Sequence, residues 1–229
     1  EANAIVIRVY GEDVVLEYEE PSAKVPIMAL FRGGYGKRIV FLGILTLCQV
    51  VPMYAIYTFG PQIMTEFGLG AGQEAILGES AVSLFFLVGT FPAMFWLNSL
   101  GRRSLLIVSL ALMTIGMMTL GIFPTAPALV IIAAFGLYAF FSGGPGILQW
   151  LNPNELFPTS VRASAVGVSI AISRLGTIAA TYSLPIMLSS FGVGPTMLSA
   201  SGLLLLGLVL SIFMAPETKG KSLTEASKL

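Results

Sequence analysis

The sequence predicts an all-α, polytopic membrane protein in which six transmembrane helices form one bundle. Of the 229 residues, 55% are hydrophobic and only 10% are charged, whereas soluble domains carry about 25% charged residues. The mean hydropathy of +0.87 agrees with this composition. A helix that spans a bilayer needs roughly 20 apolar residues, and six such runs fit between Ile39 and Phe213.

The first three predicted spans are separated by connections with clear polar or positive boundaries. The first, Ile39–Met64, begins just after Lys37 and Arg38. The second, Leu77–Leu97, follows a polar connection and ends before a pair of arginines. The third, Ser104–Phe123, starts directly after that pair. Each run is apolar without alternation, which favours a helix over a strand.

The last three predicted spans differ from one another in composition. The fourth, Ala128–Leu151, contains aromatic residues and a run of glycines. The fifth, Ala163–Leu188, is rich in Gly, Ala and Ser, and small residues let membrane helices approach one another closely. The sixth, Met197–Met214, is almost uniformly apolar. Together the six spans use most of the chain.

Several prolines lie inside these spans, where each removes a backbone hydrogen bond and tends to kink the helix. They are Pro52, Pro92, Pro145 and Pro185. The run Ser142–Gly146 is expected to weaken the fourth helix in mid-membrane, which makes Gly144 and Pro145 candidate gating residues. Ordinary packing between membrane helices is the alternative explanation for the same residues.

Positive charges gather on one side of the predicted bundle. Of the twelve Lys and Arg residues, all but Arg174 lie before the first span, in the second or fourth connection, or after the sixth span. The connections at 65–76, 124–127 and 189–196 contain neither residue type. The positive-inside rule makes the basic side cytoplasmic. We therefore expect both termini in the cytoplasm and the protein in the plasma or inner membrane.

Three regions follow from this topology. Residues 1–36 are polar and acidic and are expected to form a cytoplasmic linker that leads into the membrane. Residues 37–215 form the six-helix bundle, and residues 216–229 form a cytoplasmic tail. Because the chain begins with glutamate rather than methionine, we expect it to be a piece of a longer protein.

The composition also argues against several classes of site. There is no histidine, and Cys48 is the single cysteine, so we expect no metal site and no cofactor. No nucleophile motif or phosphate-binding loop occurs, which argues against an enzyme. The net charge of zero argues against nucleic acid as a partner.

Three loop motifs, each placed after an even-numbered span, resemble those of one transporter family. They are Gly101–Arg103, Glu155–Arg162 and Pro216–Gly220. In this order and spacing the chain resembles the C-terminal half, helices seven to twelve, of a major facilitator superfamily transporter of the sugar-porter and metabolite–proton symporter branch. The resemblance implies a twelve-helix fold, a missing N-terminal six-helix half as partner, and movement of a small molecule together with protons.

The charged residues of these motifs are predicted to meet at the cytoplasmic mouth. They are Arg102, Arg103, Glu155, Arg162 and Glu217. Ion pairs between helix ends can hold one conformation and release another, and partly desolvated pairs are stronger than exposed ones. We expect them to act as a gate. The alternative is that the arginines only set the topology and meet lipid phosphates.

The first span resembles the sugar-porter pattern in outline. Sugar porters carry a Gln-Gln pair, an Asn and later aromatics here, whereas this chain has Cys48 at the first Gln position and Tyr54 at the Asn position. Those are sugar-hydroxyl contacts in the family. Gln49 and Tyr54 flank Pro52, and with Tyr57 they are candidate substrate contacts in the cavity.

Arg174 is the most informative single residue. It lies close to the middle of the span Ala163–Leu188, where a charge costs at least about 2.5–3.5 kcal/mol and should face a cavity or a partner. Organic-anion branches of the superfamily resemble the chain here, and in them this arginine meets anionic substrate. Thr177 lies one turn away and is a further candidate contact. A structural pair with an acid of the missing half is the alternative.

The sequence thus predicts a secondary active transporter that moves a small polar metabolite, such as an organic anion, by alternating access with proton coupling. Sugar transport within the same superfamily is one alternative. A non-transporting membrane receptor on this scaffold is another.

Overall fold

The computed structural model describes residues 35–220, apart from the side chains of residues 159 and 160. In that range it contains six helices that are long and apolar enough to cross a membrane. In chain order they are α3 (Gly36–Glu66), α4 (Gln73–Ser99), α5 (Arg102–Ile122), α6 (Ala128–Leu156), α7 (Thr159–Phe191) and α8 (Val193–Met214). The predicted all-α fold is confirmed. Most helices begin earlier than predicted, because a search for apolar runs leaves out their polar first turns.

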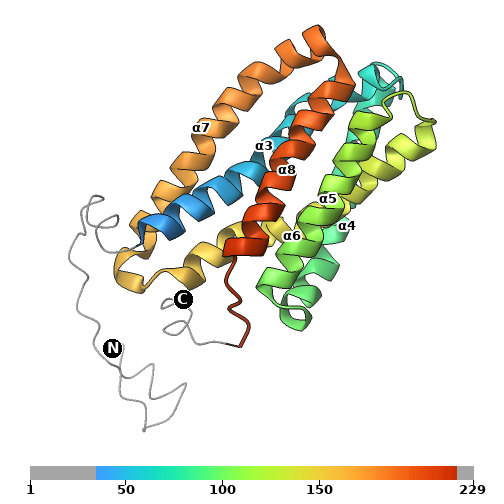
Figure 1. Ribbon diagram of the computed structural model, residues 1–229. Coiled ribbons are helices and arrows are strands. Elements are labelled where there is room, and N and C mark those ends of the chain that lie inside the picture. The colour runs from blue at the N-terminus through green and yellow to red at the C-terminus, as the bar shows by residue number, and fades with distance from the viewer. Residues whose placement is uncertain (1–34, 221–229) are drawn as a thin grey trace, which may run out of the picture.

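The helices form one bundle in which neighbours in space are often distant in sequence (Figure 1). Helix α3 packs on α7 and α8, α5 packs on both α8 and α6, and α4 packs on α6. On α5 the buried side chains recur every three or four residues, as in Leu106, Leu110, Met113 and Met117. This spacing turns one continuous stripe toward the core.

Two helices contribute much less to the core than the others. In an apolar 18-residue stretch of α3 67% of residues are buried, but only 17% in that of α4 and 22% in that of α7. The exposed side chains of α4 and α7 include large apolar ones, such as Phe95 and Leu175. Such faces need lipid or another helix bundle as their neighbour.

Helix α3 is distorted next to one of its prolines. Phe59 has non-helical dihedral angles inside α3, two residues before Pro61. Pro61 has no N–H with which to bond the carbonyl group of Tyr57, one turn earlier. The predicted weak point at Ser142–Gly146 is different, because α6 continues as a helix through the whole run.

The glycines of α6 serve close packing instead. A Cβ atom on Gly143 would lie 2.8 Å from the backbone nitrogen of Thr90 on α4. A Cβ atom on Gly89 of α4 would in turn overlap the backbone of Phe140 on α6. The structure thus shows no break at the predicted weak point, and the glycines allow two helices to touch there.

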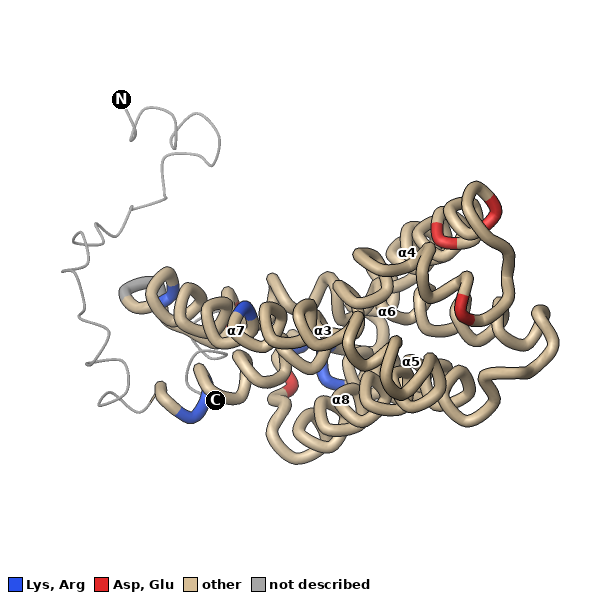
Figure 2. The backbone as a smooth tube through the Cα atoms, turned by 90° about the horizontal axis from the view of Figure 1, so that it is seen from above, with Lys and Arg blue, Asp and Glu red and all other residues tan. Residues whose placement is uncertain are grey.

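The described basic residues other than Arg174 lie toward one end of the bundle together with Glu155 and Glu217, and the other described acids lie toward the opposite end (Figure 2). We call one end the basic end. It carries Lys37 and Arg38 on α3, Arg102 and Arg103 on α5, Arg162 on α7, and Lys219 after α8. The opposite end carries Glu66 and Glu74. The linker predicted at 1–36 and the tail predicted at 216–229 lie mostly outside the described residues, which include only 35–36 and 216–220 of them.

Candidate functional site

Glu155, in the last turn of α6, is the centre of a polar network at the basic end. Its Oε1 atom lies 3.1 Å from Nη2 of Arg102 on α5, and Nε of the same arginine donates to it at 3.4 Å. The hydroxyl group of Thr218 donates to Oε2. The exposed fractions of the Arg102 and Glu155 side chains are only 19% and 13%, so the pair is partly desolvated.

Glu217 caps the start of α5 from the segment that follows α8. Its two carboxylate oxygens accept hydrogen bonds from the backbone N–H groups of Arg102 at 3.1 Å and Arg103 at 3.2 Å. The first N–H groups of a helix have no partner within the helix and favour negative charge. Gly101 precedes them with a φ of +90°, and a Cβ atom there would lie 2.7 Å from Glu217.

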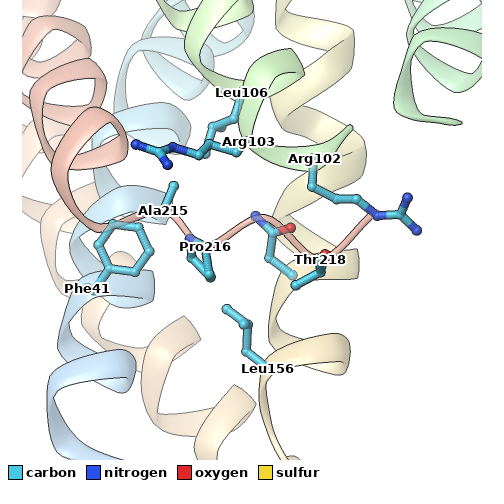
Figure 3. A pocket seen from close by; sticks show the side chains of 9 residues that line it. Phe41, Arg102, Arg103, Leu106, Leu156, Ala215, Pro216 and Thr218 are labelled. Atoms are coloured by element: carbon cyan, nitrogen blue, oxygen red, sulfur yellow. The ribbon is translucent and has the colours of Figure 1, made fainter. Parts of the chain in front are cut away.

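Two further cations tie the same segment to its neighbours. Nη2 of Arg103 donates to the carbonyl group of Ile212 on α8 at 2.7 Å. Nζ of Lys219 donates to the carbonyl group of Ser99 at the end of α4, also at 2.7 Å. Figure 3 shows how Pro216 and Thr218 run past the arginines of α5. These bonds connect the ends of α4, α5, α6 and α8. We call the set of side chains that makes them the basic-end network; it consists of Arg102, Arg103, Glu155, Glu217, Thr218 and Lys219.

Arg162, which the sequence placed in the same gate, has a different partner. Its Nε atom donates to the carbonyl group of Phe157 at 3.1 Å, within the turn between α6 and α7. Glu155 is seven residues away in sequence but bonds to α5 instead. The inclusion of Arg162 in the gate stays a prediction: in the structure Arg162 bonds within the α6–α7 turn, whereas Glu155 bonds to Arg102 on α5.

Gly144 and Pro145 do not join the network either. Both are buried in the middle part of α6. A Cβ atom on Gly144 would lie 2.6 Å from the hydroxyl oxygen of Ser109 on α5, so the glycine provides close contact between these two helices.

The second polar region surrounds Arg174, which lies next to the midpoint of α7. Its Nη1 atom donates to the hydroxyl oxygen of Tyr54 on α3 at 2.9 Å. The guanidinium carbon also lies 5.4 Å from the centre of the tyrosine ring, within the range of a cation–π contact. Among the described residues, no carboxylate lies within ion-pair distance of Arg174.

One small hollow lies beside this arginine, and a second adjoins the first at Val50 and Gln149. One is lined by Arg174, Ser173, Thr46 and Trp150, among others. The other is lined by Gln49, Ser142 and Met53, among others. Their volumes of ≈20 Å³ and ≈10 Å³ are close to that of one water molecule. The described residues alone thus form polar walls rather than an enclosed site for a metabolite.

Two other predicted substrate contacts, Thr177 and Tyr57, do not form hydrogen bonds with Arg174. Thr177 is buried, and its hydroxyl group donates to the carbonyl group of Ser173 on its own helix. The hydroxyl group of Tyr57 is buried and has no partner among the described residues, while its ring meets Phe86 edge-on at 5.9 Å. The structure therefore brings Arg174, Tyr54 and, across Gln149, Gln49 together, but leaves Tyr57 and Thr177 turned to other neighbours.

Sequence reasoning missed Gln149, Trp150 and Thr46, which line the hollow beside Arg174. A signal for the first was present, because Gln149 is an amide within an apolar span, as is Gln49. Nothing in the sequence could show which face of α6 these residues occupy. Thr218 was missed for the same reason, although its motif was recognised.

A family model described as "Sugar (and other) transporter" matches residues 12–229 of this chain. The chain belongs to this family. The resemblance that the loop motifs predicted is thereby confirmed, as is the expectation that the chain is not an enzyme, since the sugar transporter family consists of transporters.

Curated relatives in the sugar transporter family match the whole chain. It is 48% identical over 229 residues to "Putative metabolite transport protein YaaU" of Escherichia coli (strain K12), covering 100% of this chain and 52% of the relative. It is 31% identical to "Arabinose-proton symporter" of Bacillus subtilis (strain 168), again covering 100% of this chain and 52% of the relative. The chain thus spans about half the length of the curated relatives it matches.

Solved structures give the same result for the fold. The proton:xylose symporter XylE, of the major facilitator superfamily, bound to 6-bromo-6-deoxy-D-glucose, aligns with a TM-score of 0.75 at 26% identity, covering 87% of this chain and 44% of that chain. An inward open conformation of XylE from E. coli aligns with a TM-score of 0.70 over 99% of this chain and 49% of that one, at 21% identity. The chain is therefore an integral membrane protein with the six-helix bundle of a major facilitator transporter.

Proposed function

We propose that this chain forms one half of a twelve-helix secondary transporter that moves a small polar metabolite bearing a carboxylate. The partner is a second six-helix bundle, which covers the exposed faces of α4 and α7. The basic end faces the cytoplasm and both termini lie there, in the plasma or inner membrane. Transport proceeds by alternating access around a site near the membrane midplane.

The observation that carries this proposal is the Arg174–Tyr54 pair. The tyrosine hydroxyl occupies one of the five N–H donors of the guanidinium group and so orients it. No carboxylate among the described residues neutralises the charge, although a charge in mid-membrane is costly. A carboxylate on the substrate, held by two parallel hydrogen bonds, would supply the missing partner.

The basic-end network supports a gating role. It joins α5 and α6 through a partly desolvated ion pair and a part-buried helix cap, and it reaches α8 and α4 through the exposed Arg103 and Lys219. A two-state gate needs a bias of only a few kcal/mol, and in our proposal this network supplies it. In our proposal Arg102, Arg103, Glu155 and Glu217 hold one state. Arg162, Gly144 and Pro145 support it through the α6–α7 turn and the α6 packing.

Proton coupling is proposed from the relatives. Two of them are named as proton symporters, for arabinose and for xylose. Another relative, 29% identical over 77% of this chain, is named "Probable inorganic phosphate transporter 1-6" of Arabidopsis thaliana. That name describes the carriage of an anion and fits a cationic residue in the site.

Sugar transport is the second candidate function. Gln49, Gln149 and Trp150 line the hollows, and amides are suited to hydroxyl groups while an indole ring stacks on an apolar face. In this case Arg174 would pair with an acid of the other bundle instead of a substrate.

The test is uptake into proteoliposomes by the full-length protein that contains this chain. Pairs of substrates that differ only in a carboxylate or its neutral amide are compared, with and without an inward proton gradient. We expect the carboxylate to be accumulated only with the gradient, and we expect no saturable uptake by the 229-residue chain alone. Equal uptake of both members of a pair would reject the anion proposal and favour the sugar candidate.

A further inference from the structure

An apolar groove opens between the first turns of α3 and the last turns of α8, at the basic end. Its volume is ≈380 Å³, within the range of about 300–1,000 Å³ that is typical of small-molecule sites. It is lined by Gly36, Lys37, Val40, Phe41, Ile44, Leu210 and Met214. Arg174 and its hollows are not part of it.

The shape of the groove follows the helix axes. Gly36, Val40 and Ile44 recur every four residues along α3, and Leu210 and Met214 do so along α8. Residues with this spacing form a row along a helix. The groove therefore runs in the direction in which the helices cross the membrane, which is also the direction of a phospholipid acyl chain.

The walls of the groove are open to the surroundings of the bundle. The exposed fractions of Val40 and Met214 are 42% and 46%, whereas Phe41 forms a floor that is only 6% exposed. Because both helices are membrane spans, an open apolar wall on them meets hydrocarbon. An acyl chain is thus the chemistry that matches this part of the groove.

The mouth of the groove is positive. Lys37 is exposed and is the only charged residue in the lining, and within residues 35–220 no carboxylate lies within ion-pair distance of its ammonium group. Arg103, bound to the carbonyl group of Ile212 on α8, lies outside this lining. Basic pockets between membrane helices favour anionic lipid headgroups.

We propose that this groove binds one anionic phospholipid from the leaflet at the basic end. One acyl chain lies along Val40, Ile44 and Leu210, and the phosphate group meets Lys37. The site is separate from the substrate region and does not depend on the proposed transport function. It adds a lipid ligand that contacts α3 and α8 next to the basic-end network, because Phe41 also lines a small hollow together with Arg102, Arg103 and Thr218.

The test is lipid binding to the purified, delipidated protein by native mass spectrometry. Phosphatidylglycerol and phosphatidylcholine with identical acyl chains are titrated separately. A single juxtamembrane cation contributes roughly a fivefold preference for an anionic lipid. We therefore expect phosphatidylglycerol to bind at least about fivefold more tightly, Lys37→Gln to remove this preference, and Lys37→Arg to retain it.

Two further variants separate the groove from general surface charge. Leu210→Trp fills the groove and should reduce the binding of both lipids, whereas Leu129→Trp, at an exposed position at the start of α6, should leave both unchanged. Lys219→Gln removes one positive charge from the same end but outside the groove, and should keep the preference. Equal binding of the two lipids by the unmodified protein, or a preference that survives Lys37→Gln, would overturn the proposal. Lipid binding unaffected by Leu210→Trp would also overturn it and would point to another occupant, such as residues 1–34.

Discussion

The two polar regions of this bundle are built in opposite ways. In the basic-end network each carboxylate has several donors: Glu155 is bonded by Arg102 and Thr218, and Glu217 by two backbone N–H groups of α5. Around Arg174 a single hydroxyl group and a ring are the only side-chain partners among the described residues. The described residues supply partners for both carboxylates of the first region but no carboxylate for Arg174.

This difference indicates separate roles for the same kind of residue. Charges that satisfy one another stabilise an arrangement of helices, and breaking such a set costs more than it gained on forming. A charge that lacks its counterpart can accept one from outside the bundle. We therefore assign the conformational role to the basic-end network and the recognition role to the region around Arg174.

The largest expected effect is the presence or absence of thiol labelling. It tests on which side of the membrane the basic-end network lies. Cys48 is buried, so single cysteines can be introduced at Ala71, Thr125 and Asn154, all exposed. An impermeant thiol reagent applied to intact cells should label positions 71 and 125 and spare position 154. Labelling of position 154 alone would place the network outside and invert the proposed orientation.

The next largest effect is expected in the region around Arg174. Arg174→Ala removes a charge-assisted interaction of about 1.5–3 kcal/mol and should weaken apparent substrate affinity roughly 10- to 150-fold. Arg174→Lys keeps the charge but loses the two-pronged geometry, so its loss should be smaller. The measurement is uptake by the full-length protein, with expression level as the control. Failure of Arg174→Ala to fold, with recovery when an acid of the other half is neutralised, would indicate a structural pair instead.

Within the basic-end network, Glu155→Gln should destabilise the conformation seen here by about 1–3 kcal/mol, since it leaves Arg102 without its carboxylate. A double-mutant cycle with Arg102→Gln, read by thermal unfolding, should give a coupling energy of similar size. Glu66→Gln is the matched control, because Glu66 is exposed at the opposite end. Independent, additive effects at positions 102 and 155 would show that the pair contributes nothing to stability.

The smallest effects compare single hydroxyl groups in the two regions. Thr218→Val and Tyr54→Phe each remove one hydrogen bond, worth about 0.5–1.5 kcal/mol. We expect Thr218→Val to lower thermal stability with little change in substrate affinity, and Tyr54→Phe to do the reverse, with an affinity loss of roughly two- to tenfold. The same pattern in both variants would contradict the division of roles.

The sequence alone determined the number, order and approximate bounds of the spans, and it placed all the motif cations at one end. These features follow from local properties, namely the thickness of the hydrocarbon layer and the cost of placing a charge in it. The motifs also identified the family before any contact was known. Arg174 stood out for the same local reason, as a charge in mid-span.

Only the tertiary structure decided which residues meet. Glu155 pairs with Arg102, 53 positions away, rather than with Arg162, seven positions away. Tyr54 reaches Arg174, and Gln149 and Trp150 join the same wall. Gly143 of α6 fits against α4 and Gly144 fits against α5, while α6 remains helical. Such pairings depend on how each helix is rotated about its axis and which neighbours it packs against. The rotation of each helix and its choice of neighbours are set by the packing of the whole bundle, and the separation of residues along the chain does not determine them.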